Sequence, residues 1–307
     1  MRNPILTIAI PTYNRPEKIK RQVNSVLSQL TDDVSLVIID NHSEQPVSTL
    51  FDDETIKKIK VVRNRFNMGG DGNIAKCFDV CETDWLWTLS DDDYLANNAV
   101  QTVLKDIQDD GECLFINYNR KNTREICGLK DFSKNGIDMY SYLFWISACV
   151  YNVKRLGQYM CYYYRAISSM QPSVSLLIKA LASNDENKIL LSDHRIIVGG
   201  GKGIGWNREN FLYASLYVFD YLRADSFILN GTVFKKIVSM CLMNVSLIYN
   251  DDRKFIKAFR LYSIIISRRG VINILRYNFI DCIRFIFFLC YLQIFQKKIN
   301  TGTEEDC

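Results

Sequence analysis

The sequence has few of the residues that build a zinc site or a disulfide framework. It contains only two histidines, and its ten cysteines are irregularly spaced, with no C-x-x-C pair. Cys149, Cys282 and Cys290 lie inside apolar runs. Zinc sites need closely spaced Cys and His ligands, and disulfide frameworks belong mainly to small secreted domains. The sequence therefore argues against both, and it predicts reduced, buried cysteines in a cytosolic protein.

Long apolar segments are also absent. A membrane-spanning helix needs about 20 predominantly apolar residues, and the best candidate, residues 285–292, is too short. Residues 1–10 lack the basic start, extended apolar stretch and small-residue cleavage site of a signal peptide. We therefore expect a cytoplasmic protein, and peripheral attachment to the inner face of the plasma membrane stays open.

The chain lacks an even spread of net charge, because its positive balance is concentrated near the C-terminal end. Residues 253–300 hold ten Lys and Arg against a single acid, Asp281, so this segment has a net charge of +9. Because the whole chain has a net charge of +4, the remaining residues together have a net charge of −5. Such asymmetry indicates an anionic partner. Two interpretations remain: the solvated face of a packed helical appendage, or an interfacial helix on anionic lipid. No nucleic-acid-binding motif accompanies the charge, so we do not expect nucleic acid as a partner.

The first 120 residues alternate short apolar runs with stretches of helical spacing. This alternation is typical of a parallel sheet that is covered by helices on both faces. We predict an α/β fold with a mostly parallel, Rossmann-like sheet and a C-terminal helical appendage. The expected strands are residues 6–10, 36–40, 59–62, 85–89 and 113–116, and the expected helices are residues 16–30, 73–81 and 97–107.

Unusual polar residues follow the predicted strands. In parallel sheets, ligands bind at the carboxyl ends of the strands, so these residues are expected to gather at one edge. They form four clusters, which are Pro-Thr-Tyr-Asn-Arg at 11–15, Asp-Asn at 40–41, residues 64–70, and Ser-Asp-Asp-Asp at 90–93.

The acidic run at Asp91, Asp92 and Asp93 is the strongest of these clusters. Adjacent carboxylates repel one another, and the strand before them is apolar. A single Asp would be enough to cap the next helix. Three are better explained by a divalent cation, because Mg²⁺ and Mn²⁺ prefer hard oxygen ligands. We therefore predict a metal site here.

The other clusters offer groups for a nucleotide, each with a plainer alternative. Asp40 can accept a hydrogen bond from a base or ribose, or simply shape a turn. Tyr13 can stack on a base or only pack, and Arg15 can approach phosphate. Residues 65–73 place three glycines before a helix, where backbone N–H groups can meet an anion. Neither this stretch nor the glycine-rich residues 199–205 forms a dinucleotide fingerprint or a P-loop.

Together these motifs resemble the glycosyltransferase family 2 pattern on the GT-A fold, over roughly residues 5–110. The order and spacing of P-x-Y-N-R, the strand-end Asp, N-x-G before a helix and a D-x-D within residues 90–93 all match, and it stays open whether Ser90 stands at the first D-x-D position. The resemblance implies that Tyr13 and Asp40 contact the nucleoside and that Asp91 contacts the ribose or diphosphate. It implies a nucleotide-sugar site of Pro11, Tyr13, Arg15, Asp40, Asn67, Gly69, Asn73 and Asp91, with Mn²⁺ or Mg²⁺ on Asp92 or Asp93.

The later part of the chain is similar to the branch that builds O-antigen and capsule sugars, including abequosyltransferase-like proteins. The resemblance implies an inverting transferase that moves a sugar from a nucleotide-diphosphate donor to a hydroxyl of a lipid-linked surface-polysaccharide intermediate. Such a reaction needs a general base; Asp193 is the preferred candidate, before Asp185 and His194, and an ordinary surface role is the alternative for each. The glycine-rich loop at residues 199–206, which ends in Trp206, is a candidate lid.

The expected organisation is a glycosyltransferase domain over residues 1–208 and a basic helical region over 209–307. The first domain divides into a nucleotide-sugar-binding half, 1–120, and an acceptor half, 121–208. Two alternative functions remain. A nucleotidyltransferase would usually have a glycine-rich loop after its first strand, which residues 11–15 lack. A catalytically silent nucleotide-sugar-binding module stays open because no general base is obvious.

Overall fold

The computed structural model divides into two compact units, residues 1–205 and 206–307. It describes residues 4–118, 123–200 and 208–224, followed by positions 237–242, 245, 260–261, 264–265 and 283. Residues 201–206 of the predicted lid, including Trp206, lie outside the described residues, as does most of the basic segment 253–300. Within the described part of the second unit, the main element is helix α9, Arg208–Ala224. No helix among the described residues is long and apolar enough to cross a membrane.

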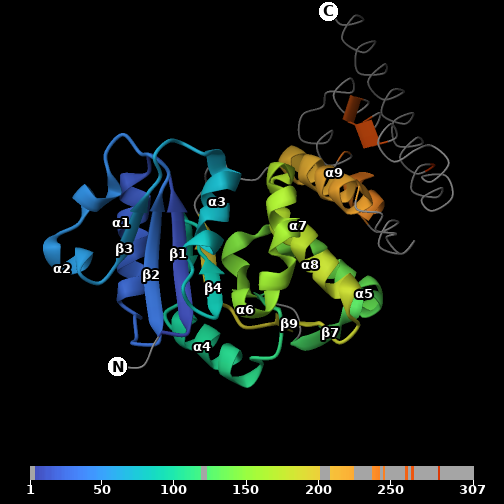
Figure 1. The fold of residues 1–307 in the computed structure, drawn as a ribbon, viewed down its shortest axis with the longest axis horizontal. Helices are drawn as coiled ribbons and strands as arrows, with labels where there is room; N and C mark the ends of the chain where they lie inside the picture. The colour runs from blue at the N-terminus through green and yellow to red at the C-terminus, as the bar shows by residue number, and fades with distance from the viewer. Residues whose placement is uncertain are drawn as a thin grey trace, which may run out of the picture. The chain divides into compact units, whose positions relative to one another are not determined.

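The first unit is built on an eight-stranded sheet with the order β3-β2-β1-β4-β8-β6-β9-β7. Six strands run in one direction, and β8 and β7 run against them. The strands are β1 (Leu6–Thr12), β2 (Val34–Asp40), β3 (Lys60–Arg63), β4 (Trp85–Thr88), β6 (Phe115–Tyr118), β7 (Arg124–Cys127), β8 (Cys149–Asn152) and β9 (Lys188–Ser192). The predicted mostly parallel sheet is confirmed, and Figure 1 shows β2, β1 and β4 side by side.

Helices cover both faces of this sheet, as the apolar strands require. On one face, α1 (Pro16–Leu27) and α4 (Ala99–Asp109) bury their apolar side chains in one core cluster with alternate side chains of β1, β2 and β4. Both helices bury residues at helical spacing, and the predicted apolar face of α4 is buried throughout. Pro16 stands at the start of α1, where its fixed φ suits the first turn. This face holds the main hydrophobic core.

The opposite face is covered by α3 (Gly69–Asp79), which contacts β1, β2 and β4, and by aromatic packing further along the sheet. Phe78 of α3 has its ring centroid 5.0 Å from that of Tyr151 on β8 and 4.6 Å from that of Tyr163 on α7 (Met160–Arg165). The Tyr151 ring also lies 5.1 Å from Phe115 of β6. This aromatic cluster joins α3 and α7 to the antiparallel part of the sheet.

A small second sheet stands at the end of β4. It pairs β5 (Asp93–Leu95) with β10 (Ile197–Gly200) in antiparallel register, so that Gly200 lies opposite Asp93. The sequence analysis did not predict β5, β7, β8 or β10. The remaining described helices of the first unit are α2 (Asp53–Ile56), α5 (Gly128–Asp131), α6 (Val153–Leu156) and α8 (Pro172–Ser183).

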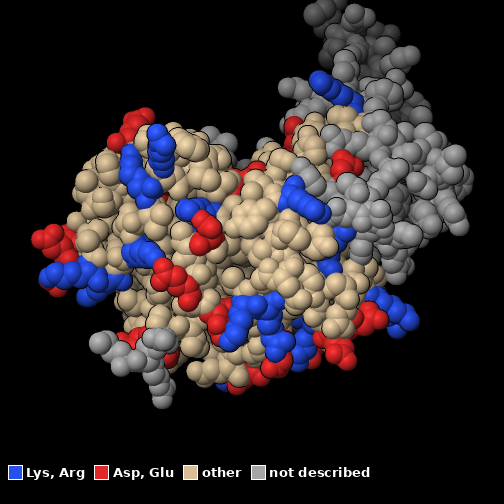
Figure 2. All heavy atoms as spheres, viewed as in Figure 1, with Lys and Arg blue, Asp and Glu red and all other residues tan. Residues whose placement is uncertain are grey.

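Charges of both signs lie next to one another on the surface of the first unit that Figure 2 shows, without a broad patch of one sign. This mixing agrees with the modest negative balance that the sequence leaves outside residues 253–300. Because most of residues 253–300 lie outside the described residues, the two interpretations of that segment stay predictions.

The aromatic cluster generates a stability prediction. Replacing Phe78 with Ala should lower the free energy of unfolding by about 3–5 kcal/mol, because a buried ring is lost and a cavity remains. Denaturant titration followed by tryptophan fluorescence would measure the loss. Phe66→Ala is the matched control, since Phe66 is 63% exposed and its loss should change stability by less than about 0.5 kcal/mol. Equal losses in the two variants would contradict the packing described.

Candidate functional site

The carboxyl ends of three parallel strands meet at one edge of the sheet. Thr12 at the end of β1 lies opposite Asp40 at the end of β2, and Asp40 lies opposite Arg63 at the end of β3. The acidic run follows β4, which is paired with β1 on the other side. The structure therefore brings the predicted polar clusters to a common edge, as expected for a ligand site.

Asp91 connects the acidic run to the end of β1. Its side chain is buried, and it accepts hydrogen bonds from the Thr12 hydroxyl at 2.7 Å and from Nη1 of Arg15 at 2.8 Å. Arg15 keeps 41% of its side chain exposed. The paired carboxylate is therefore enclosed by the protein, while the guanidinium retains free surface for another anion.

Asp92 is the most accessible acid of the run, with 19% of its side chain exposed. One oxygen accepts from the Ser90 hydroxyl at 2.7 Å, and the other accepts from Nζ of Lys18 at 3.1 Å and faces Arg15 at 3.5 Å. Burial alone would raise the pKa of Asp92, but these donors and positive charges lower it overall. Asp92 is therefore held as a carboxylate.

Asp93 occupies a different environment. It is buried and accepts a hydrogen bond from Nε1 of Trp145 at 2.9 Å. Burial raises the pKa of Asp93 above its usual value, although Ser147 and Trp145 act in the opposite direction. The pKa values of these two neighbouring carboxyl groups are thus shifted in opposite directions. Asp92 is therefore the better candidate for a cation ligand.

Backbone contacts fix the turn that carries these acids. Nη2 of Arg21 donates to the carbonyl oxygens of Asp91 and Asp93, at 3.1 and 3.4 Å. The Arg21 guanidinium also lies 4.2 Å from the centroid of the Tyr94 ring. On the other side, the backbone N–H of Ser90 donates to the Ser147 hydroxyl at 2.8 Å. The positions of the carboxylates are therefore set by α1 and by the segment around Ser147.

Asp40 supports the loop that follows β2. It is fully buried, and its oxygens accept from the backbone N–H groups of Ser43 and Val47 and from Arg63. Burial alone would raise its pKa, but these donors lower it overall. Both oxygens thus already have protein donors. The observed role is to fold residues 40–47 back toward β1, and the predicted contact with a nucleoside stays a prediction.

A network of asparagines fixes the start of α3. The Asn41 side chain donates to Asn67 at 2.8 Å and to the Gly69 carbonyl at 3.2 Å. Asn64 donates to Asn41 and Asn73, and Asn73 donates to the carbonyl of Ile39 at 3.2 Å. Gly69 has a φ of +75°, which a side chain would disfavour. The predicted residues Asn67, Gly69 and Asn73 therefore hold the glycine-rich turn against the ends of the strands.

A cavity of about 260 Å³ lies between the start of α1 and the loop after β2. The loop that Asp40 folds supplies one wall, and the segment after β1 supplies the other. Pro11 lies within β1, and Tyr13 is 42% exposed beside the cavity-lining residues Thr12 and Asn14. The lining residues are Thr12, Asn14, Arg15, Pro16, Ile19, Ser43, Glu44, Gln45, Val47 and Leu50.

The residues predicted as general bases lie away from the acidic run. Asp193 follows β9, three strands from β4, which corresponds to about 14 Å at the usual strand spacing; it accepts a hydrogen bond from Thr123. Asp185 precedes β9 and so lies at the opposite edge of the sheet. His194 has Nδ1 3.1 Å from Asp106 on α4. The catalytic roles of Asp193, Asp185 and His194 stay predictions.

Several residues of the site were not singled out from the sequence. Lys18 and Arg21 follow Arg15 at three-residue intervals, a spacing that places side chains on one face of a helix; this signal was available. Trp145 and Ser147 lie more than 50 residues from their partners Asp93 and Ser90. No local sequence pattern predicts such long-range contacts.

A metal is implied by the resemblance, and the residues can be tested against it. No group of three or more His, Cys, Asp or Glu side chains in the described part of the chain is arranged to hold an ion. Mg²⁺ and similar cations, however, are often held by one or two carboxylates together with substrate phosphates. Asp92, ionised and partly accessible, fits that kind of site. The residues therefore suit a cation shared with a phosphate ligand rather than one enclosed by protein alone.

Comparison with known proteins agrees with this architecture. A β-1,3-glucosyltransferase from Campylobacter jejuni that acts on GalNAc(5)-diNAcBac-PP-undecaprenol is 23% identical over 140 residues, which is 44% of each chain. The abequosyltransferase of Salmonella typhimurium is 29% identical over 101 residues, 31% of this chain and 30% of that one. The chain thus aligns with less than half the length of these curated relatives.

The fold also matches a solved structure. A mannosyltransferase from Pyrobaculum calidifontis, in complex with GDP-Man and Mn²⁺, aligns with a TM-score of 0.50 and 8% identity, over 96% of this chain and 88% of that one. At this identity the likeness concerns the fold alone. It agrees with the mostly parallel sheet flanked by helices. The model of the family described as Glycosyl transferase family 2 matches residues 7–156, just under half of the chain, so this segment is similar to glycosyl transferase family 2.

Proposed function

We propose that the protein is an inverting glycosyltransferase that moves a sugar from a nucleotide-diphosphate donor to a hydroxyl of a lipid-linked surface-polysaccharide intermediate. The observation that carries the proposal is the cluster of Arg15, Lys18 and Asp92 beside the cavity at the ends of β1 and β2. Cationic side chains suit a diphosphate, and an adjacent ionised carboxylate suits the cation that accompanies it.

The cavity beside α1 is the proposed nucleoside site. Its volume of about 260 Å³ lies just below the range usual for whole-ligand pockets, so it suits the nucleoside part of a donor rather than the whole molecule. Ser43, Glu44 and Gln45 offer polar groups for a base or ribose. In this arrangement, Asp40 acts by holding the loop, and Tyr13 remains available to stack.

The diphosphate would lie between this cavity and the acidic run. Arg15 and Lys18 are partly exposed and can reach it, while Asp92 would hold Mn²⁺ or Mg²⁺ together with phosphate oxygens. When bound, such a cation neutralises charge that develops on the leaving diphosphate. Asp93, buried against Trp145, would keep the turn in place.

The lipid-linked acceptor is supported by the Campylobacter relative, whose name specifies an undecaprenol-linked sugar. The O-antigen branch is supported by the abequosyltransferase relative. A nucleotidyltransferase is less favoured, because the turn at residues 11–15 contains no glycine. A catalytically silent binding module is the remaining alternative, and only an activity measurement separates it from the enzyme.

The deciding experiment measures nucleotide release from UDP-, GDP-, CDP- and dTDP-sugars with undecaprenyl-diphosphate-linked sugars as acceptors. We expect release with one donor class in the presence of Mn²⁺ or Mg²⁺, and loss of that release with EDTA, because the leaving diphosphate is then no longer neutralised. Titration of the protein with the free nucleoside diphosphates gives an independent measure of binding. Binding without turnover for every donor and acceptor would favour the silent module, and release that persists in EDTA would refute the metal.

Changing Asp92 to Asn should lower the transfer rate by about 100-fold or more, because several kcal/mol of transition-state stabilisation by the cation are lost. The concentration of Mn²⁺ that gives half-maximal rate should rise as well. The control is Asp84→Asn, an exposed acid paired with Lys154 at the other end of β4, which should keep the wild-type rate. An unchanged rate and metal dependence in Asp92→Asn would remove this residue from the site.

A further inference from the structure

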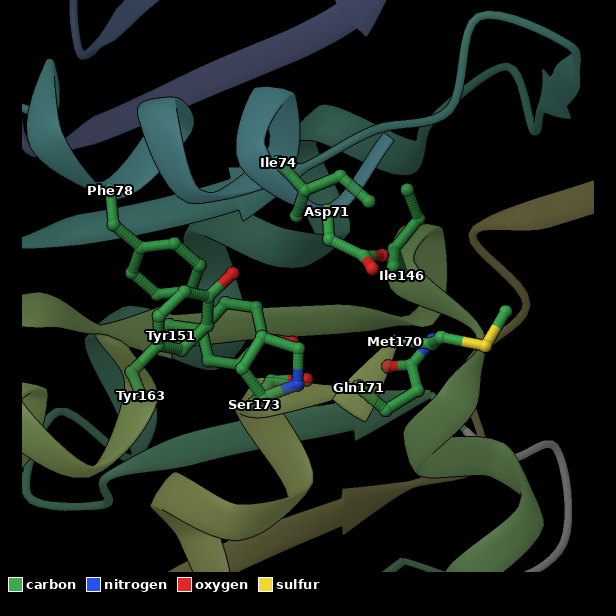
Figure 3. A pocket seen from close by; sticks show the side chains of 10 residues that line it. Asp71, Ile74, Phe78, Ile146, Tyr151, Tyr163, Met170, Gln171 and Ser173 are labelled. Carbon is green, nitrogen blue, oxygen red and sulfur yellow. The ribbon is translucent and has the colours of Figure 1, made fainter. Parts of the chain in front are cut away.

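A small pocket lies on the α3 face of the sheet, separate from the cavity beside α1 (Figure 3). The carboxylate of Asp71, from the first turn of α3, points into it. Its volume is about 10 Å³, which is the room that one water molecule or one hydroxyl group needs. The other lining residues are Ile74, Phe78, Ile146, Tyr151, Tyr163, Met170, Gln171, Pro172 and Ser173.

Asp71 differs from the other acids near the site because its carboxylate has no protein donor. Asp40, Asp91, Asp92 and Asp93 each accept hydrogen bonds, whereas no hydrogen bond or ion pair joins Asp71 to any residue that the structure describes. Burial raises the pKa of Asp71 above its usual value. The site therefore contains a partly buried carboxylate whose oxygens are available to a ligand.

The groups facing Asp71 cannot neutralise it. Among the described residues that line the pocket there is no Lys, Arg or His. The titratable side chains opposite it are Tyr151 on β8 and Tyr163 on α7, and burial raises the pKa of both phenols well above the usual value. They are therefore neutral at physiological pH and leave Asp71 as the acid–base group of the pocket.

The pocket adjoins the acidic run through one short segment. Ile146 lines the pocket, and its carbonyl accepts a hydrogen bond from Thr88 at the end of β4. The residue before it, Trp145, donates to Asp93, and the residue after it, Ser147, accepts from Ser90. The pocket and the acidic turn are thus held by consecutive residues. On the other side, the asparagine network fixes α3 two residues before Asp71, at the Gly69 carbonyl.

The opposite wall is held in an unusual backbone conformation. Met170 has a φ of +65°, which non-glycine residues seldom adopt. It directly precedes Gln171, whose side-chain amide donates to the Phe144 carbonyl at 3.3 Å. Such strain persists where the surrounding structure fixes it, and it is frequent at functional sites. The turn before α8 is therefore fixed across the pocket from Asp71.

We propose that Asp71 is the general base of the transfer reaction and that its pocket receives the attacking hydroxyl group of the acceptor. This inference rests on the proposed function. The proton of the acceptor hydroxyl passes to the Asp71 carboxylate while the hydroxyl oxygen forms a bond to the anomeric carbon of the donor. The bond from that carbon to the diphosphate breaks, and the nucleoside diphosphate leaves with the electron pair. The small volume admits the hydroxyl and leaves the acceptor ring outside.

Asp71→Asn tests the proposal with the donor that the wild-type protein uses, with transfer to the acceptor and hydrolysis by water measured in parallel. We expect the transfer rate to fall about 10²–10⁴-fold, the usual contribution of a general base, while the affinity for the free nucleoside diphosphate stays unchanged. Asp79→Asn is the matched control on the same helix, because Asp79 is exposed and paired with Lys76. It should retain the wild-type rate.

The pH profile supplies a readout that a structural role would not move. A base must be deprotonated, so the wild-type kcat/KM should rise with pH through the raised pKa of Asp71 and level off above it. Asp71→Asn should lose this acid limb in its residual activity. Asp71→Glu, which keeps a carboxylate and the fold, should retain the limb with a reduced rate.

Three results would overturn the proposal. They are a wild-type rate in Asp71→Asn, an unaltered acid limb in that variant, and a weakened nucleotide affinity with the transfer rate at saturation preserved. The last would make Asp71 a donor-binding group. Absence of transfer and hydrolysis in the wild-type protein would instead refute the proposed function itself, so the two failures are distinguishable.

Discussion

The ion pairs between the first turns of α1 and the turn after β4 are the constraint on which the site depends. Arg15 and Lys18 hold Asp91 and Asp92, and Arg21 holds the backbone between them. Without these cations, three consecutive carboxylates at the end of a buried strand would repel one another and lose solvation. Because Asp91 is enclosed and Arg15 is not, the pairs also leave positive charge facing the edge of the sheet, where an anionic ligand would bind.

Buried polar side chains also hold the loops at the other strand ends. Asp40 folds the loop after β2, and the asparagine network fixes the turn before α3. In both places a buried polar side chain forms hydrogen bonds with backbone N–H or carbonyl groups. Without these bonds the backbone groups would be buried and unpaired. The exposed side chains between them, such as Tyr13 and Arg15, are then presented by a rigid support. Residues that look like ligand contacts in the sequence are therefore divided between supporting and contacting roles.

Most of the fold could be predicted from periodicity, because strands that are buried on both faces give continuous apolar runs and α1 and α4 give clear helical spacing. The edge carrying the site followed from the parallel arrangement alone. The antiparallel strands β7 and β8 were not predicted, because they lie beyond residue 120, where the regular alternation of strands and helices ends. The candidates for the general base that the sequence offers lie after residue 180, and one of them, Asp185, precedes β9. Sequence position cannot reveal which end of a strand faces the site until the strand order is known.

Asp71 was overlooked for a related reason. It lies inside the glycine-rich stretch at residues 69–72, where the glycines alone account for a turn before a helix and a single acid gives no further signal. Its distinguishing property is the lack of a partner within the described structure, and this property depends on Tyr163, Gln171 and Ile146, which are 70 or more residues distant in sequence. Hydrogen-bond donors and positive charges around a carboxylate lower its pKa and so weaken it as a base. The acids of the conspicuous run already accept hydrogen bonds from the protein, so the carboxylate that is left to accept a proton is the inconspicuous one.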